Sequence, residues 1–268
     1  PLDAFPYLLA VYRHNSGAEP AYLQNVYTRA EAIYRTYTVP THLKVQFLTW
    51  TGDRARRAGD LTKAEDYLRR ALNLVEQSGL ENERGAVLIS LAQVHMAVAD
   101  FAQANRLWEQ NLALQQSLGD APQTTRALLN LAAGYQAAGE THKAQDLLER
   151  ALVSARTADD PILIARSTEA LADLAAEQPD TLDHAQAIYE DCLGIYLSSE
   201  QPDAALTVYI KLVRLLMDGG RFDDALATLC KAASYTNDLT LPDLVSTLAA
   251  LKLAAGDHLR AVAYWSAL

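Results

Sequence analysis

A short phrase recurs along this chain at a nearly constant interval. "AGDLTKAEDYLRRALNL" begins at Ala58, and "AGETHKAQDLLERALVS" begins at Ala138. One alanine keeps its place in six copies: Ala64, Ala104, Ala144, Ala185, Ala225 and Ala261. Its successive spacings are 40, 40, 41, 40 and 36 residues. A period of this length indicates structural units that stack on one another, because one unit cannot bury its own apolar surface.

The pattern inside each copy is helical. Four residues after the alanine comes a large side chain: Leu68, Trp108, Leu148, Tyr189, Leu229 and Trp265. A second small residue usually follows three positions later, as Ala71, Ala151, Cys192 and Ala232 do, whereas Asn111 breaks the rule. Spacings of three and four predict helices, and small residues let two helices approach closely. Each copy therefore predicts a pair of antiparallel helices.

Turn residues set the expected bounds of these helices. Gly59, Gly139 and Gly220 suit the end of a helix, and Pro122 and Pro161 suit the start of one. We predict helices over 3–14, 20–37, 41–58, 61–78, 82–98, 101–118, 122–138, 141–157, 161–177, 182–198, 202–219, 222–236, 242–255 and 258–268. These form about seven pairs, of which the first and last are atypical. An N-terminal pair (1–40) precedes one continuous array with repeats at 41–78, 82–118, 122–157, 161–198, 202–236 and 242–268.

The amino-acid composition narrows the classes of function that this chain could have. Half of the 268 residues are apolar, yet no apolar run approaches the ~18 residues that span a bilayer. The net charge of −10 opposes direct binding of nucleic acid. Two cysteines are too few for a disulfide framework, so we expect a cytoplasmic protein. Because no apolar run is long enough to span a bilayer, we also expect no membrane contact. Because the sequence begins at Pro1, we interpret it as a segment of a longer or processed protein.

No catalytic constellation is recognisable. There is no phosphate-binding glycine loop, no HExxH and no GxSxG, and the six histidines are scattered. His95 takes a position that Tyr135 holds in a sister copy, which favours the edge of the core over a metal site. Cys192 occupies a packing position, as a small buried thiol does. We therefore predict no enzyme activity, no catalytic residue, no cofactor and no bound metal.

The repeat resembles a known family. Seven residues match the tetratricopeptide repeat (TPR) position for position: Leu131, Ala132, Tyr135, Gly139, Ala144, Leu148 and Ala151. The resemblance runs from about residue 41 to the end. The long period is similar to that of kinesin light chains and of bacterial signalling regulators, including the sensor arms of multidomain ATPases such as the maltose-regulon activator. "LAAGDHLRAVAYWSAL" also resembles the C-terminal repeats of such regulators.

The resemblance implies an all-α, right-handed superhelical solenoid whose first helices line a concave groove. By register, the groove-facing residues are Gln93, Met96, Arg126, Asn130, Gln136, Arg166, Glu169, Lys211 and Arg214. The same register turns Gln46, Thr49, Asp53 and Arg56 inward. Guanidinium and amide groups suit carboxylates and peptide backbones. A solvated face without a defined ligand is the alternative, and the family's carboxylate clamp is not expected because its residues are only scattered here.

The leading hypothesis is a non-catalytic module that binds a protein or peptide segment in this groove, as the sensor or interaction arm of a larger bacterial regulatory protein. One alternative is an inducer-binding domain that controls a linked ATPase or DNA-binding domain, and another is a scaffold for a multiprotein assembly. Two features stay open. Six of the thirteen tyrosines lie in the first 37 residues. The two alternatives are that they pack the atypical first helix pair and that they form a contact surface for an upstream domain. Trp265 and Leu268 leave an apolar C-terminal edge for self-association or additional domains.

Overall fold

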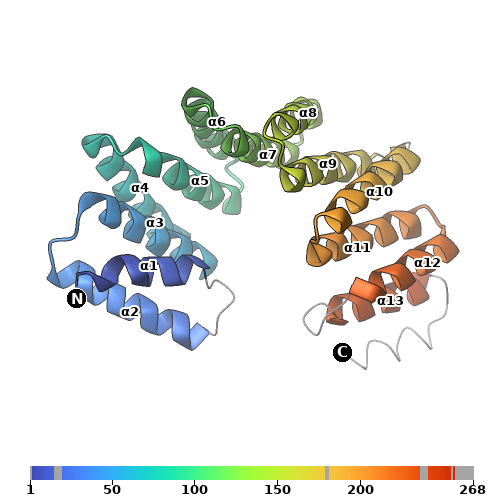
Figure 1. Cartoon of the computed structure of the whole chain (residues 1–268), viewed down its shortest axis with the longest axis horizontal. Coiled ribbons are helices and arrows are strands. Elements are labelled where there is room, and N and C mark those ends of the chain that lie inside the picture. Colours follow the sequence, from blue (N-terminus) through green and yellow to red (C-terminus); the bar gives the residue numbers. More distant parts are fainter. Residues whose placement is uncertain (1, 15–19, 179–180, 236–240, 255, 257–268) are drawn as a thin grey trace. The chain divides into compact units, whose positions relative to one another are not determined.

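The computed structural model describes residues 2–14, 20–178, 181–235, 241–254 and 256, and these residues form helices and turns without any strand. The helices are α1 (Ala4–His14), α2 (Pro20–Thr36), α3 (Thr41–Arg57), α4 (Leu61–Ser78), α5 (Glu81–Ala97), α6 (Phe101–Leu118), α7 (Ala121–Ala137), α8 (Thr141–Thr157), α9 (Pro161–Ala176), α10 (Leu182–Ser198), α11 (Pro202–Asp218), α12 (Phe222–Ala232), the 3-10 turn η2 (Ala233–Tyr235) and α13 (Leu241–Ala254). Odd-numbered helices are the first of each pair and even-numbered helices the second (Figure 1). The predicted all-α fold of helix pairs is confirmed.

The helix bounds agree closely with the prediction. Every helix in the described residues begins within one residue of its expected start. The ends agree as well, except that α12 stops at Ala232 and continues as η2 to Tyr235. The predicted helix over 258–268, with Ala261, Trp265 and Leu268, lies outside the described residues. No helix among the described residues is long and apolar enough to cross a membrane.

The chain forms two compact units, 1–119 and 120–268, with α1–α6 in the first and α7–α13 in the second. The boundary falls between two repeats. Gly119 ends α6 in a left-handed conformation, and the Asp120 carboxylate accepts a hydrogen bond from the backbone N–H of Gln123 at the start of α7. The single continuous solenoid over 41–268 stays a prediction.

Local chemistry explains where the helices begin. Asp60, Asp100, Asp120 and Asp160 each accept a hydrogen bond from a backbone N–H in the first turn of the following helix. The first N–H groups of a helix lack partners within it, so a carboxylate there stabilises the start. These four caps account for the sharp starts of α4, α6, α7 and α9.

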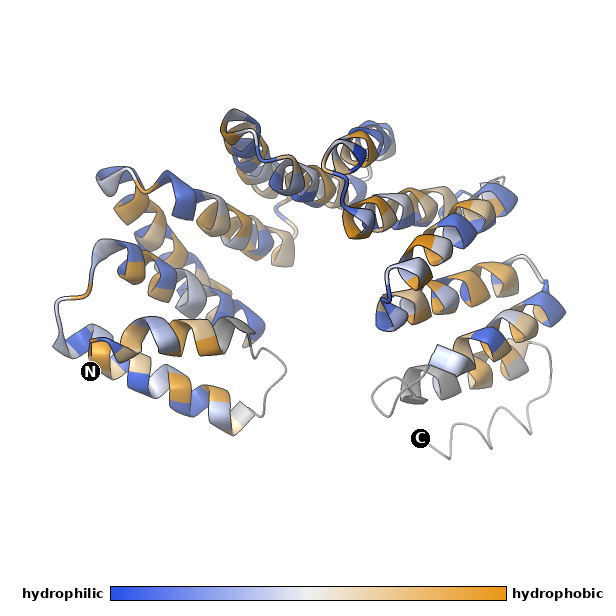
Figure 2. Cartoon of the chain, viewed as in Figure 1, coloured by the Kyte–Doolittle hydropathy of each residue, from blue (hydrophilic) through white to orange (hydrophobic). Residues whose placement is uncertain are grey.

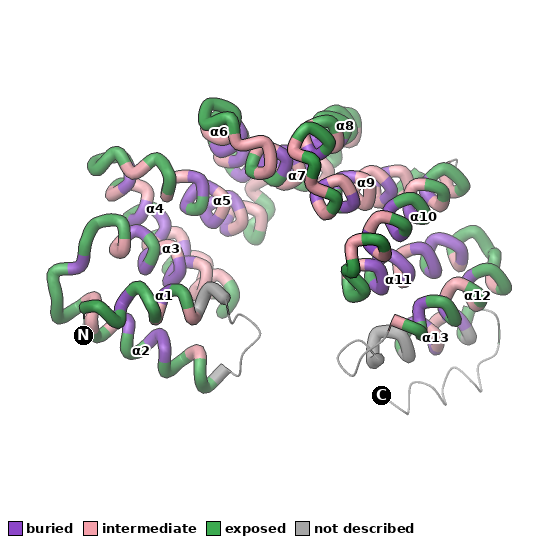
Figure 3. The backbone as a smooth tube through the Cα atoms, in the orientation of Figure 1, coloured by how far each residue is buried: buried purple, intermediate pink, exposed green. Residues whose placement is uncertain are grey.

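The alanines of the repeat lie at the helix crossings, as predicted. Ala64, Ala104, Ala144, Ala185 and Ala225 are each 0% exposed. Their large neighbours, such as Leu68 and Leu148, are buried with them, and buried stretches alternate with exposed ones along each helix (Figure 3). The α3–α4 crossing also depends on Gly52, because a Cβ atom there would lie 2.5 Å from Cγ of Leu68.

Asn111 breaks the small-residue rule but is still buried, at 1% exposure. Its space comes from the facing helix, where Gly85 of α5 lies beside it. A Cβ atom on Gly85 would meet Oδ1 of Asn111 at 3.0 Å and Nε2 of Gln115 at 2.8 Å. Gln115 donates a hydrogen bond to Asn111, so the crossing is filled by a polar pair in place of a small apolar side chain.

The first pair packs through aromatic rings. Tyr34 stacks on Phe47 with ring centroids 4.6 Å apart, and Tyr27 meets Trp50 edge-on at 5.4 Å. Tyr7, Tyr22 and Tyr37 are exposed instead, so only part of the N-terminal tyrosine set serves packing. Figure 2 shows hydrophobic stretches alternating with hydrophilic ones along the helices of this part of the chain.

Candidate binding sites on the first helices

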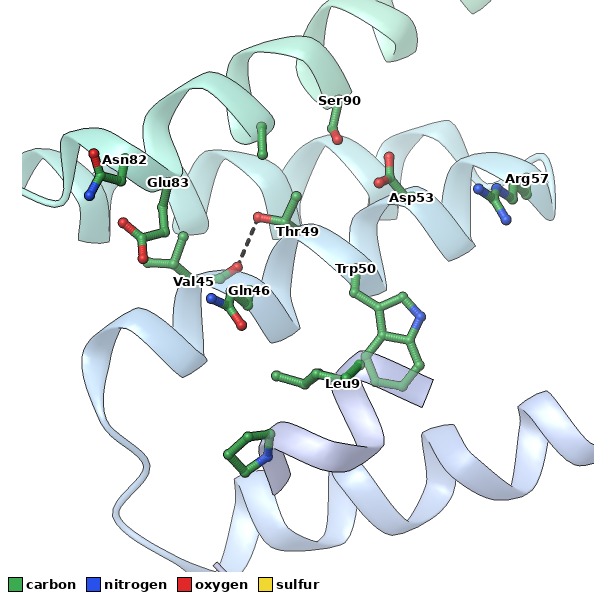
Figure 4. A pocket seen from close by; sticks show the side chains of 13 residues that line it. Leu9, Val45, Gln46, Thr49, Trp50, Asp53, Arg57, Asn82, Glu83 and Ser90 are labelled. Carbon is green, nitrogen blue, oxygen red and sulfur yellow. Dashed lines mark hydrogen bonds between the residues drawn. The ribbon is translucent and has the colours of Figure 1, made fainter. Parts of the chain in front are cut away.

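A pocket of about 530 Å³ lies in the first unit, between the first helices α1, α3 and α5 (Figure 4). One wall is apolar and comes from α1, while α3 and α5 supply most of the polar groups. The lining residues are Pro6, Leu9, Ala10, Val45, Gln46, Thr49, Trp50, Asp53, Arg57, Asn82, Glu83, Ala86 and Ser90. Seven of these thirteen residues are polar or charged, which makes the pocket more polar than most small-molecule sites.

Asp53 is the most shielded charge in this pocket. Burial raises the pKa of the Asp53 carboxyl, while a hydrogen bond from Ser90 and the nearby charges of Arg56 and Arg57 act in the opposite direction. Nε of Arg56 lies 3.9 Å from Oδ1 of Asp53, which is an ion pair without a hydrogen bond. The carboxylate oxygen Oδ1 is therefore buried and retains an unused capacity to accept a hydrogen bond.

Other polar side chains of the pocket are also unengaged. Among the described residues, the side chains of Gln46, Asn82, Glu83 and Arg57 make no hydrogen bond or ion pair within 4.0 Å. Thr49 differs, because its hydroxyl donates to the carbonyl of Val45 at 2.8 Å. Polar groups that converge on one pocket without protein partners are available to a ligand.

The repeat register grouped several residues of α3 and α5 on one face, and some of them line this pocket. Gln46, Thr49 and Asp53 line the pocket, whereas Gln93 and Met96 lie further along α5, half-buried and outside the lining. The α1 wall and the residues Asn82 and Glu83 were missed. The first pair does not follow the repeat, so no spacing in the sequence placed α1 beside α3.

The second unit holds a charged network on its own first helices. Nζ of Lys211 on α11 lies 2.6 Å from Oε1 of Glu169 and 2.7 Å from Oδ2 of Asp173, both on α9. Two tyrosines of the second helix α10 complete it, since Tyr196 donates to Glu169 at 2.9 Å and Tyr189 donates to Asp173 at 2.6 Å. The predicted site residues Glu169 and Lys211 are thus brought together and bind each other.

Burial or hydrogen bonds raise the pKa of three side chains in this network. Burial acts to lower the pKa of Lys211, but the hydrogen bonds to Asp173 and Glu169 outweigh it, and the pKa is raised. Burial and the two carboxylates raise the pKa of Tyr189 and of Tyr196. The nearby Cys192 thiol donates to the carbonyl of Ala165 at 3.3 Å, and burial raises its pKa to about 12, so it is a packed thiol and not a thiolate at neutral pH.

The remaining predicted residues of this unit are more open. Arg126, Arg166 and Arg214 are exposed and make no hydrogen bond or ion pair among the described residues. Arg126 and Arg166 are 40 residues apart and so hold the same repeat position on α7 and α9. Asn130 is half-buried, and Gln136 donates to Oε1 of Glu177 at 2.5 Å.

The remaining observations concern His95, metal binding and a smaller pocket. His95 is half-buried between Asp100, 3.4 Å from its Nδ1, and Glu65, 3.9 Å from its Nε2, at the edge of the core where it was predicted. The described residues contain no group of three His, Cys, Asp or Glu side chains arranged to hold a metal ion. A smaller pocket of about 240 Å³ lies beside α10 and α11, where Arg221 bonds Gln186 across it.

Comparison with solved structures shows the same fold in several proteins. A Rap protein in complex with competence and sporulation factor superposes with a TM-score of 0.71 at 15% identity, over 100% of this chain and 73% of that one. The apo form of RapI gives a TM-score of 0.73 at 17% identity, over 98% of this chain and 74% of that one. At these identities the likeness concerns the fold.

A third relative is larger. A signal transduction ATPase with numerous domains (STAND), with a tetratricopeptide repeat sensor, from Pyrococcus horikoshii, gives a TM-score of 0.69 at 18% identity. The match covers 91% of this chain but only 38% of that protein. A search of curated proteins finds no match to this sequence. The model of the MalT-like TPR region matches residues 52–267, which is most of the chain, and the chain therefore belongs to that family.

Proposed function

We propose that this chain is a non-catalytic module that binds a protein or peptide segment on the faces of its first helices, and that it serves as the sensor or interaction arm of a larger cytoplasmic regulatory protein. The observation that carries the proposal is the pocket between α1, α3 and α5. Among the described residues, its Gln46, Asn82, Glu83 and Arg57 side chains have no hydrogen-bond or ion-pair partner, and its α1 wall is apolar. A peptide presents the matching combination of backbone amides and side chains.

The composition of the pocket favours a peptide over a small molecule. Gln46 and Asn82 each carry both a donor and an acceptor, as a peptide group does. Small-molecule sites are lined mostly by apolar side chains. The volume of about 530 Å³ nevertheless suits a drug-sized ligand, so a small inducer is the second candidate.

The relatives support both parts of the proposal. One Rap structure contains competence and sporulation factor, and the STAND protein is described as having a tetratricopeptide repeat sensor. This chain covers 38% of that STAND protein. In the second unit, Arg126, Asn130, Arg166 and Arg214 are the proposed contacts for a protein or peptide segment bound to that unit.

The experiment is a selection from a random library of seven-residue peptides, followed by affinity measurement on the enriched sequences. We expect Gln46→Ala/Asn82→Ala to weaken binding roughly tenfold, because each lost hydrogen bond contributes about 0.5–1.5 kcal/mol. A matched control, Asn73→Ala/Gln77→Ala, removes the same two side-chain types from the exposed face of α4 and should bind as the wild type does.

Arg126→Ala/Arg166→Ala tests the second unit in the same assay. Retained binding by the pocket variant together with loss in the α4 control would contradict the proposal. Failure to enrich any peptide, with saturable binding of a small metabolite that the pocket variant abolishes, would favour the second candidate.

A further inference from the structure

The pocket of the first unit carries opposite charges at its two ends. Figure 4 shows Glu83 at one end and Arg57 at the other, with Thr49 between them. Glu83 lies in the first turn of α5, and Arg57 is the last residue of α3. Neither side chain has a hydrogen bond or ion pair among the described residues.

The neighbouring charges do not cancel these two. Near Arg57, the Asp53 carboxylate is already flanked by Arg56 at 3.9 Å, so one positive charge is in excess. Near Glu83, Arg84 is engaged with Glu81 at 3.2 Å, so one negative charge is in excess. Lys44, the next cation on α3, does not line the pocket.

The register of α3 and α5 gives the separation of the two charges. Ser90 of α5 and Asp53 of α3 both line the pocket, and Ser90 acts on the pKa of Asp53, which places these two residues near each other. Glu83 lies seven residues before Ser90, and Arg57 lies four residues after Asp53. Eleven residues of helix rise about 16 Å, so the two charges are about 16 Å apart along the pocket. An extended peptide covers that span in about five residues.

The middle of the pocket is apolar on one side. Leu9 and Trp50 face each other there, and both are 8% exposed, so they form a floor. Ala10 of α1 also lines the pocket. A bound segment with an apolar side chain at its centre would therefore bury it against α1 and Trp50.

Resting on the proposed function, we propose that the pocket selects an extended peptide segment with a cationic side chain against Glu83, an apolar side chain against Leu9 and Trp50, and an anionic side chain against Arg57. The spacing of the two charges is the selective feature. Segments with two like charges at these positions place one of them against a like charge of the protein, which costs binding energy.

The experiment uses the full chain and three blocked seven-residue probes. Each probe is glycine except for a central leucine and charged residues at the second and seventh positions, five residues apart, which are Lys and Asp, Lys and Lys, or Asp and Asp. The wild type should bind the Lys/Asp probe best, by roughly three- to tenfold in Kd, since each exposed pair contributes about 0.2–1 kcal/mol. The preference should shrink as salt is added.

Charge reversal gives the decisive comparison. Glu83→Lys should bind the Asp/Asp probe best, and Arg57→Glu should bind the Lys/Lys probe best. The double variant Glu83→Lys/Arg57→Glu should again bind the Lys/Asp probe best. Its pocket still has one positive and one negative end, and the probe binds it in the opposite direction. An unchanged ranking in variants that still bind would overturn the charge selection and leave the proposed function standing. No binding of any probe by the wild type would overturn the charge selection alone if the random library still yields peptides that bind, and would overturn both proposals if the library also yields none.

Discussion

Ala99 occupies a backbone conformation that sister repeats give to glycine. Gly59, Gly139 and Gly220 turn the chain between the two helices of a pair with φ of 81°, 78° and 72°. Ala99 has φ 59° at the same place. A side chain in the left-handed region costs about 1–2 kcal/mol, so this repeat carries local strain that the packing of α5 and α6 must offset.

We therefore expect Ala99→Gly to stabilise the protein. The released strain exceeds the entropy that glycine loses on folding, and the net gain should be about 0.5–1 kcal/mol. Chemical denaturation measures it. Gly139→Ala is the matched reverse change, because its Cβ atom would meet nothing within 4 Å and only the conformation is altered. If both variants shifted stability in the same direction, backbone strain would not be the cause.

At the scale of elements, the network of Lys211, Glu169, Asp173, Tyr189 and Tyr196 ties α9, α10 and α11 together. Its three proton-bearing groups all have raised pKa values in the folded protein. A raised folded pKa gives stability that is fully present below the unfolded pKa and is lost as pH rises through the folded one. For tyrosine the unfolded value is 10.0 and for lysine it is 10.5, so the loss begins above about pH 10.

Alkaline denaturation tests this dependence. The free energy of unfolding should fall steeply above pH 10 in the wild type, and less steeply in Tyr189→Phe/Tyr196→Phe, which lacks the two tyrosine hydroxyls of the network. Tyr22→Phe, on an exposed side chain of α2, should leave the slope as it is. Parallel curves for the wild type and the double variant would show that the two tyrosines do not govern alkaline stability.

At the scale of the whole molecule, each unit contains its own buried clusters. The first unit has one around Phe5, Tyr27 and Phe47 and another around Leu68 and Leu91, while the second has a large one around Tyr189 and Leu212. Repeats of this kind draw their stability from contacts with adjacent repeats. Each unit therefore has what it needs to fold by itself.

We expect a fragment of residues 1–119 to fold alone. It ends at Gly119, which is already a helix end, so the cut leaves no helix broken. Circular dichroism should show a helical protein with a single cooperative urea transition. A fragment that is unstructured, or that unfolds without a transition, would mean that the first unit depends on the second.

Much of the architecture could be predicted because it rests on local chemistry. The Asp caps, the turn glycines and the spacing of Ala64 through Ala225 lie within a few residues of what they control, so helix starts and crossings followed from them. The same register grouped Gln46, Thr49 and Asp53, which line one pocket, with Arg56, which does not line it.

Contacts between helices of different pairs were decided by the tertiary structure. Spacing marked Glu169 and Lys211 as free groove residues, but only packing showed that they bind each other and that Tyr189 and Tyr196 reach them from the second helix. The α1 wall of the pocket likewise comes from an aromatic first pair that has no repeat period. The physical reason is that a period states which face a residue takes, whereas the reach of its side chain depends on the rotation and offset of the neighbouring helix, which packing alone sets.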